Sequence, residues 1–312
     1  MGNLYSKLAR GGGLGAEEEK EWSCVSAEEV PELMRCPHID KGYRPSESLS
    51  WSQVAGSLWR AHNETGNVWT HLLPAPYFAY ETLRVLLSDA RGFDRRSDRL
   101  AFAGFTASAA ALLGASSAFH LGCCKDPAAF RTLQLCDYEG INLLMSGMYL
   151  PGVWFSHGQL HPRTAVAYFA VVALVGLRVS GTNWARRNRS AEGRGRVRKL
   201  LALEGTWGVL VVAHFVAKHW AGRGGGGATP PQVRQFLRAV GGMWGAFGVG
   251  FLFFLSGFPE RCAPGKFDLV GHSHQWWHVC CVAGCGWWTR EMRKLNAMNM
   301  AMRMRMRPKI IK

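Results

Sequence analysis

The chain has 312 residues, of which 48% are hydrophobic and 19% charged, and its formal net charge at pH 7 is +15. This length and composition fit either one membrane domain of several helices or one large soluble domain. The basic residues are spread over several loops and the C-terminal tail and form no aromatic-interleaved face, which excludes nucleic acid as an expected partner. We therefore interpret the positive charge as membrane-flanking.

The first 66 residues are strongly polar, and we expect them to form a cytosolic segment with an amphipathic approach to the first helix. Residues 1–30 are rich in glutamate and lack the apolar core of a cleavable signal peptide. The opening MGNLYS matches the N-myristoylation pattern at Gly2, and this modification requires a cytosolic N-terminus. The first spanning helix is then expected to act as the insertion signal.

Seven stretches of the chain lack Asp, Glu, Lys and Arg, and polar loops separate them. Four exceed the roughly 18 apolar residues that make a good spanning candidate, and the other three need neighbouring charged side chains to snorkel or face inward. Soluble core helices are the alternative, but they rarely show so many charge-poor runs. We predict an all-α membrane protein with a seven-transmembrane helix bundle, whose apolar windows are 65–80, 100–124, 140–162, 164–177, 205–217, 239–259 and 269–289.

The basic residues of the loop at 186–199 are expected to lie in the cytosol by the positive-inside rule. With seven helices, the N-terminus lies on the same side. The tail at 290–312 is also basic and would then lie outside, so charge alone supports this orientation only in part. We expect the tail to be disordered. The predicted division is a polar segment at 1–66, a transmembrane domain at 67–289 and a basic tail at 290–312.

Three of the histidines inside the charge-free windows stand out: His120 in the second window, and His274 and His278 in the seventh. An ionisable or metal-binding side chain is costly in hydrocarbon, so a functional site is the first hypothesis for each. His274 and His278 are four residues apart and share one face of a helix. Three neutral imidazoles suit a catalytic zinc ion, whose fourth position stays open. Histidines that merely pack or hydrogen-bond inside a bundle are the alternative.

Alternating spans would bring these histidines to one membrane face together with Asp137, which lies at the mouth of the third window. Zinc lowers the pKa of its bound water to about 7, and an adjacent Asp137 can accept the released proton. Ser116, one helical turn before His120, can support the water or an oxyanion. An N-cap of the third helix is the alternative role for Asp137. The residues thus predict a zinc site with Asp137 and Ser116 as catalytic groups.

Three sequence blocks carry a family resemblance: HNETGNVWTHLLP at 62–74, SSAFH to DYEGI at 116–141, and PGKFDLVGHSHQWWH at 264–278. In this order they resemble the signature blocks of the progestin and adipoQ receptor family, which includes adiponectin receptors and haemolysin-III-related proteins. The resemblance runs from Gly42 to Cys285, most of the chain.

The resemblance implies seven transmembrane helices, a cytosolic N-terminus and a zinc ion near the cytosolic face. The family's zinc ligands fall on His120, His274 and His278. Its water-orienting aspartate falls on Asp137 and its motif serine on Ser116. The seventh helix departs from the family with a Trp-Trp pair before His278, which should reshape the pocket wall without removing a ligand.

Adiponectin receptors of this family are associated with ceramidase-like hydrolysis. Other members are described as progestin receptors or regulators of lipid and zinc homeostasis. The resemblance therefore implies a receptor, a hydrolase or both. We favour a signalling receptor of the plasma membrane or an endomembrane that hydrolyses an amide-linked lipid such as ceramide. One alternative is a non-catalytic receptor with structural zinc and an external protein or steroid ligand. A metal or proton transporter ranks last, because the carboxylates near the helices are limited to Glu81, Glu139 and Glu204.

Other polar residues of these blocks are interpreted structurally. Gly66 and Pro74 should weaken the first helix near its start. His272 is expected to cap or support the seventh helix rather than bind metal. The short stretch after His278 predicts a seventh helix that barely spans, with no eighth helix. The remaining residues, which we assign to the amphipathic approach and helix start, are His62, Asn63, Glu64, Asn67 and His71.

Overall fold

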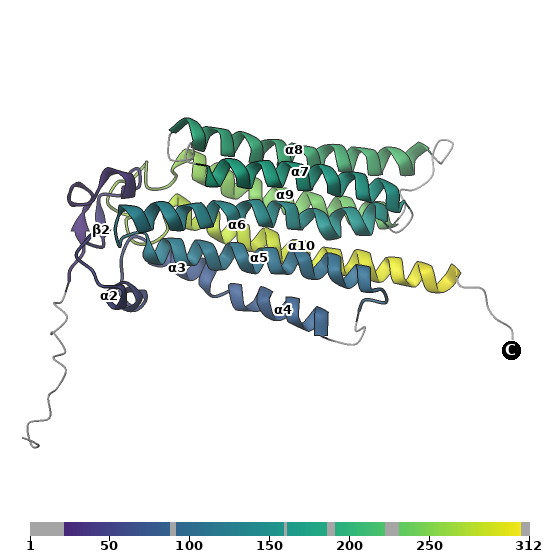
Figure 1. Cartoon of the computed structure of the whole chain (residues 1–312), viewed down its shortest axis with the longest axis horizontal. Coiled ribbons are helices and arrows are strands. Elements are labelled where there is room, and N and C mark those ends of the chain that lie inside the picture. The colour runs from purple at the N-terminus through teal and green to yellow at the C-terminus, as the bar shows by residue number, and fades with distance from the viewer. Residues whose placement is uncertain (1–21, 88–91, 159–160, 186–190, 222–230, 307–312) are drawn as a thin grey trace, which may run out of the picture.

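The apolar windows fall largely within helices that lie side by side in one bundle (Figure 1). The computed structural model describes residues 22–306 apart from 88–91, 159–160, 186–190 and 222–230. Gly2 and residues 307–312 therefore lie outside the described residues. The helices of the bundle are α3 (Thr65–Leu72), α4 (Ala75–Leu87), α5 (Arg96–Gly122), α6 (Pro127–Val153), α7 (Pro162–Trp184), α8 (Ala191–Ala221), α9 (Pro231–Ser256) and α10 (Ser273–Met306).

Four described helices are long and apolar enough to cross a membrane: α5, α7, α9 and the 199–218 part of α8. Large apolar side chains also cover the outside of the bundle, where Leu177 on α7 and Leu252 on α9 are 71% and 67% exposed. Such an outer surface suits lipid rather than water. The predicted all-helical architecture is confirmed, and the chain has the features of an integral membrane protein.

The first predicted helix is broken at Pro74, as its sequence indicated. α3 ends at Leu72 and α4 begins at Ala75, because proline lacks the N–H that would continue the helix. Gly66 has a different role, since a Cβ there would lie 2.3 Å from Gln275 Cδ. The absence of a side chain lets α3 approach the start of α10.

The third helix starts much earlier than its apolar window. α6 begins at Pro127, where the Asp126 side chain caps it by accepting hydrogen bonds of 2.8 Å from the backbone N–H groups of Ala128 and Ala129. Asp137 therefore lies inside α6, and the N-cap alternative for Asp137 is wrong. The cause is that the charge-free window marks the apolar part of the helix, whereas the cap marks where the helix begins.

The last helix corrects the expectation of a short seventh helix and a disordered tail. α10 has 34 residues and passes the predicted end at 289. Its continuation is ordered because it buries apolar side chains, among them Met292 and Leu295, which are 0% and 1% exposed. Basic side chains of this part are paired with acids from the start of the bundle: Arg293 with Glu81, and Arg303 with Asp94 and Asp98.

Replacing Met292 by alanine should destabilise the protein by about 2 to 5 kcal/mol, because the variant loses a fully buried side chain and leaves a cavity. Met304, on the same helix, is 62% exposed, so its replacement by alanine is the matched control and should change little. Thermal unfolding of both variants in detergent measures the difference. Equal unfolding temperatures would show that the C-terminal part of α10 does not contribute to the core.

The described part of the predicted polar segment, from residue 22 onward, forms a cap that includes β2 and α2 and covers the end of the bundle where α5 ends and α10 begins (Figure 1). Arg44 attaches the cap, because its guanidinium donates to the carbonyl oxygens of His120 (2.7 Å) and Leu121 (2.6 Å) and to Ser57 Oγ (2.8 Å). The short elements of the cap are β1 (Val25–Ser26), η1 (Ala27–Glu29), η2 (Glu32–Met34), β2 (Lys41–Tyr43), α2 (Trp51–Gly56) and η3 (Ser57–Trp59), and β1 pairs antiparallel with β2.

Candidate metal centre

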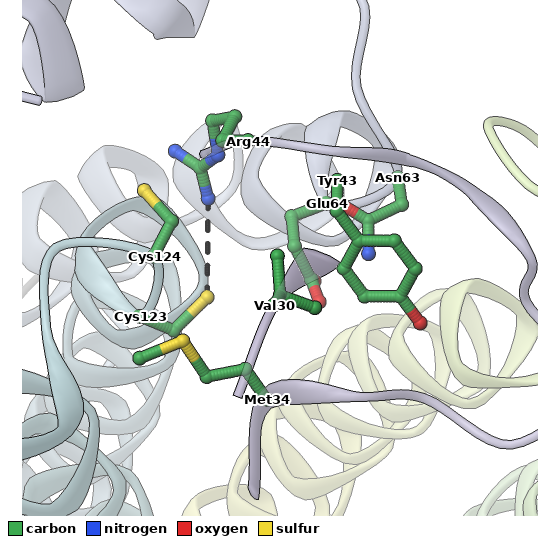
Figure 2. A pocket seen from close by; sticks show the side chains of 8 residues that line it. All are labelled: Val30, Met34, Tyr43, Arg44, Asn63, Glu64, Cys123 and Cys124. Carbon is green, nitrogen blue, oxygen red and sulfur yellow. Dashed lines mark hydrogen bonds between the residues drawn. The ribbon is translucent and has the colours of Figure 1, made fainter. Parts of the chain in front are cut away.

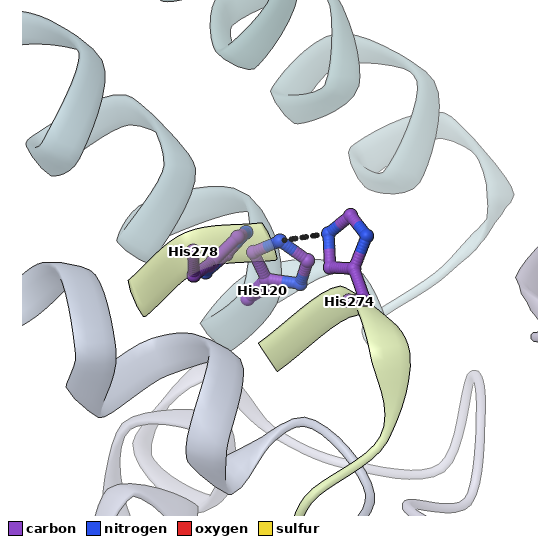
Figure 3. A group of neighbouring side chains, drawn as sticks. All are labelled: His120, His274 and His278. Carbon is purple, nitrogen blue, oxygen red and sulfur yellow. Dashed lines mark hydrogen bonds between the residues drawn. The ribbon is translucent and has the colours of Figure 1, made fainter. Parts of the chain in front are cut away.

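The three predicted ligand histidines lie together beneath the cap (Figure 3). His120 comes from the last turn of α5, and His274 and His278 from the first turns of α10. One ring nitrogen from each lies within 4.8 Å of the others, and the Nε2 atoms of His120 and His274 are 3.3 Å apart. A single tetrahedral metal ion can be bound by three nitrogens in such a cluster.

Glu64 supports the first of these histidines. Nδ1 of His120 lies 2.7 Å from Glu64 Oε2, and Asn67 Nδ2 donates to the same oxygen at 2.6 Å. A carboxylate only accepts, so Nδ1 carries the hydrogen and Nε2 keeps its lone pair for a metal. Burial alone would raise the pKa of Glu64, but the adjacent His120 imidazole and the hydrogen bonds hold it below its ordinary value. The carboxylate can therefore stay ionised beside the ligand.

The third ligand is oriented in a similar way by α3. Nδ1 of His278 lies 3.2 Å from the carbonyl oxygen of Asn67 and 3.2 Å from Thr70 Oγ1. A carbonyl also only accepts, so the hydrogen is on Nδ1 and Nε2 is left for a metal. His71 stacks on the His278 ring at a centroid distance of 3.7 Å. The three imidazoles, with the groups that orient His120 and His278, match the donor set that zinc requires.

Asp137 and Ser116 lie on two neighbouring helices beside the histidines. The Ser116 hydroxyl lies near the Asp137 carboxyl, and Asp137 is within electrostatic reach of His120. The backbones come close because Gly140 on α6 has no side chain: a Cβ there would lie 2.8 Å from Leu112 Cα on α5. The structure thus brings together all five residues that the sequence predicted for the site.

Two further residues of the signature blocks, His272 and Glu64, take part in contacts near the histidine cluster. His272 Nε2 contacts the carbonyl oxygen of Asn63 at 3.1 Å, so it joins the start of α10 to the cap and stands apart from the ligand cluster, as predicted. Glu64 was interpreted as part of a helix start, and its contact with His120 was missed. The signal that could have revealed this contact is that Glu64 is the only carboxylate in the block at 62–74, which the resemblance places beside a metal site.

A small cavity of about 20 Å³ lies between the cap and the bundle on the border of the site (Figure 2). This volume holds about one water molecule. Glu64 lines the cavity and also contacts His120. The Glu64 side chain therefore lies between this cavity and the histidine cluster. The residues that line it are Val30, Met34, Tyr43, Arg44, Asn63, Glu64, Cys123 and Cys124.

Replacing Glu64 by glutamine should weaken zinc binding by about 10- to 100-fold, because the variant keeps the size of the side chain but loses the charge that orients and polarises His120. The zinc dissociation constant, measured by competition with a fluorescent chelator, tests this directly. Glu32→Gln is the control, since Glu32 is an exposed carboxylate elsewhere on the cap. Unchanged affinity in Glu64→Gln would contradict the supporting role.

A family model described as haemolysin-III related matches residues 59–288, which contain all the ligand histidines. The chain belongs to the haemolysin-III-related family. The predicted resemblance to progestin and adipoQ receptor proteins is confirmed by curated relatives of that type.

Members of the family from distant organisms align over most of the chain. An adiponectin receptor protein of Drosophila melanogaster is 29% identical over 85% of this chain and 58% of its own length. Heptahelical transmembrane protein 1 of Arabidopsis thaliana is 29% identical over 91% of this chain and 89% of its own length. The membrane progestin receptor delta of Homo sapiens is 29% identical over 83% and 75%, respectively. The chain thus spans less than two thirds of the Drosophila protein.

Proposed function

We propose that this haemolysin-III-related chain is a membrane receptor that binds zinc through His120, His274 and His278 and hydrolyses an amide-linked lipid such as ceramide. The observation that carries the proposal is the convergence of three imidazoles, two of them oriented by neighbouring groups, with an Asp–Ser pair at the end of an apolar bundle. A purely structural zinc site is usually closed by a fourth protein ligand. Among the described residues, the metal-binding cluster has three.

Each residue of the site has a defined task in this proposal. A zinc ion would supply the charge that polarises a carbonyl group and acidifies water. Asp137 would accept the proton of the attacking water and pass it to the leaving amine. The Ser116 hydroxyl would donate a hydrogen bond to the oxygen of the scissile carbonyl as negative charge develops there. Glu64 and Asn67 would keep two of the imidazoles in the correct orientation.

We propose seven spans and a cytosolic N-terminus. Four of the spans would be the apolar helices α5, α7, α8 and α9. The other three would be α6, α10 and the α3–α4 pair, which lie alongside them in the bundle (Figure 1). The basic residues of the loop at 186–199 support this orientation by the positive-inside rule. The divisions at 66 and 289 remain part of the proposal, with α10 continuing beyond the membrane.

A non-catalytic receptor is the second candidate, because the ligands come from two helices. Zinc bound to His120 on α5 and to His274 on α10 would tie these helices together, and an external ligand could then bias their packing. Relatives named as adiponectin and progestin receptors support an external protein or steroid as that ligand.

Purified protein in lipid nanodiscs separates the two candidates. Elemental analysis gives the zinc content, and mass spectrometry measures fatty acid released from ceramide. The hydrolase proposal expects one zinc per chain and a release of fatty acid that stops when a chelator removes the metal. One zinc per chain without release from ceramides of several chain lengths would favour the non-catalytic receptor.

A further inference from the structure

A buried carboxylate on α8 takes no part in the metal centre. Glu204 is 1% exposed and lies within an apolar span. Its Oε1 accepts a hydrogen bond of 2.7 Å from Ser146, whereas its Oε2 has no partner among the described residues. An ionisable group inside a spanning helix is expensive and marks an ion or proton pathway more often than a packing contact. Further polar groups lie on both sides of Glu204 along the bundle.

Toward the metal-centre end of the bundle, polar side chains continue along one face of α6. Glu139, Asn142 and Ser146 are three and four residues apart, which places them on the same face. Ser180 on α7 donates to Glu139 and accepts from Asn142 Nδ2 at 3.0 Å. Gly176 on α7 leaves room for the Ser146 hydroxyl, because a Cβ at position 176 would lie 3.0 Å from Ser146 Oγ.

Toward the opposite end, the polar groups pass from α8 to α7 and to the π-helical turn η4 (Trp154–Gly158) that follows α6. Tyr168 on α7 hydrogen-bonds to His214 on α8. The ring of His157 lies 5.2 Å from that of Tyr168, and His157 Nδ1 is 2.8 Å from Ser156 Oγ. These groups reach the end of the bundle that is distant from the ligand histidines.

The line through Glu139, Asn142, Ser146, Glu204, Tyr168 and His157, which we call the polar seam, crosses most of a bilayer. At 1.5 Å per residue, about 27 Å of helix rise separates Glu139 from His157, against about 30 Å for the hydrocarbon core. Polar groups also join helices in membranes without carrying ions. Groups that serve only this purpose should be mutually satisfied, yet Glu204 Oε2 and the buried Trp207 Nε1 have no partner among the described residues.

We propose that the polar seam is a proton-conducting path between α6, α7 and α8, with Glu204 as its central relay. The Glu204 carboxylate takes a proton from one side of the seam and releases it to the other, so that no further reactant is needed. The buried apolar side chains of Val153, Ala165 and Val211 pack together with Tyr168 and Trp207, beside the part of the seam between Glu204 and His157. They form a seal that keeps conduction slow in this conformation.

Proton flux into vesicles tests the proposal. Protein in liposomes that contain a pH-sensitive dye is energised with a potassium diffusion potential and valinomycin. Wild-type protein should acidify the lumen faster than protein-free vesicles, and Glu204→Gln, which keeps the shape but cannot relay a proton, should return the rate to that background. Val211→Ser should raise the rate, because it adds a hydroxyl to the apolar seal. Val209→Ser, at a 51% exposed position of the same helix, should behave as wild type.

Two results would overturn the proposal. One is a Glu204→Gln flux equal to that of wild type. The other is background flux in both the wild type and Val211→Ser, at equal protein incorporation measured on the same vesicles. Because the readout is proton flux, its outcome is separate from that of the ceramide assay.

Discussion

Zinc is expected to be lost from the protein when His278 is replaced by alanine. His278 is 2% exposed and is one of the three histidines of the cluster, so the variant leaves two of these imidazoles to hold the metal. Metal binding by such sites contributes many kcal/mol, and removing a ligand should cost more than the roughly 100-fold that a supporting residue contributes. Dialysed His278→Ala protein should therefore contain little zinc.

Elemental analysis after dialysis measures this loss, and His272→Ala provides the matched control. His272 lies on the approach to the same helix but bonds the cap through the Asn63 carbonyl oxygen. The control should retain zinc. Full zinc occupancy in His278→Ala, or equal loss in both variants, would contradict the assignment of ligands.

The histidine cluster could be predicted because two simple regularities locate its members. Helical periodicity places His274 and His278 on one face, and alternation of the spans brings His120 to the same end of the bundle. Neither rule depends on the loops or on helix ends. The helix ends themselves were predicted poorly: apolar windows report lipid contact, whereas α6 starts at its Asp126 cap and α10 continues while it buries Met292.

The sequence could not predict which residues touch where the cap meets the bundle, or which face of each helix meets its neighbours. Glu64 meets His120 only because the cap and α3 fold against the end of α5, and Gly66 permits the approach to α10. Glu139 and Glu204 were both noted as carboxylates near the helices, but their place in one polar seam depends on how α6, α7 and α8 are rotated about their axes. Single-sequence patterns carry no information about those rotations.

Replacing Asp137 by alanine should abolish hydrolysis while zinc remains bound. Asp137 contacts Ser116 and lies near His120, but it is outside the cluster of metal ligands. A general acid–base group contributes about 10²- to 10⁴-fold to the rate, and the turnover number measured per bound zinc should fall by that factor. Ser116→Ala should have an effect of about 10²- to 10³-fold, because it removes one hydrogen bond to the developing oxyanion.

Asp98→Asn is the control for burial, because Asp98 is a 0% exposed carboxyl of α5 at the opposite end of the bundle, paired with Arg303. Its turnover per zinc should match the wild type. If Asp137→Ala also hydrolyses ceramide at the wild-type rate, the proton relay is wrong. If the wild type itself shows no hydrolysis while ligand-dependent signalling depends on His120, zinc acts by joining α5 to α10. The ratio of turnover to bound zinc therefore distinguishes a metal that does chemistry from a metal that holds two helices together.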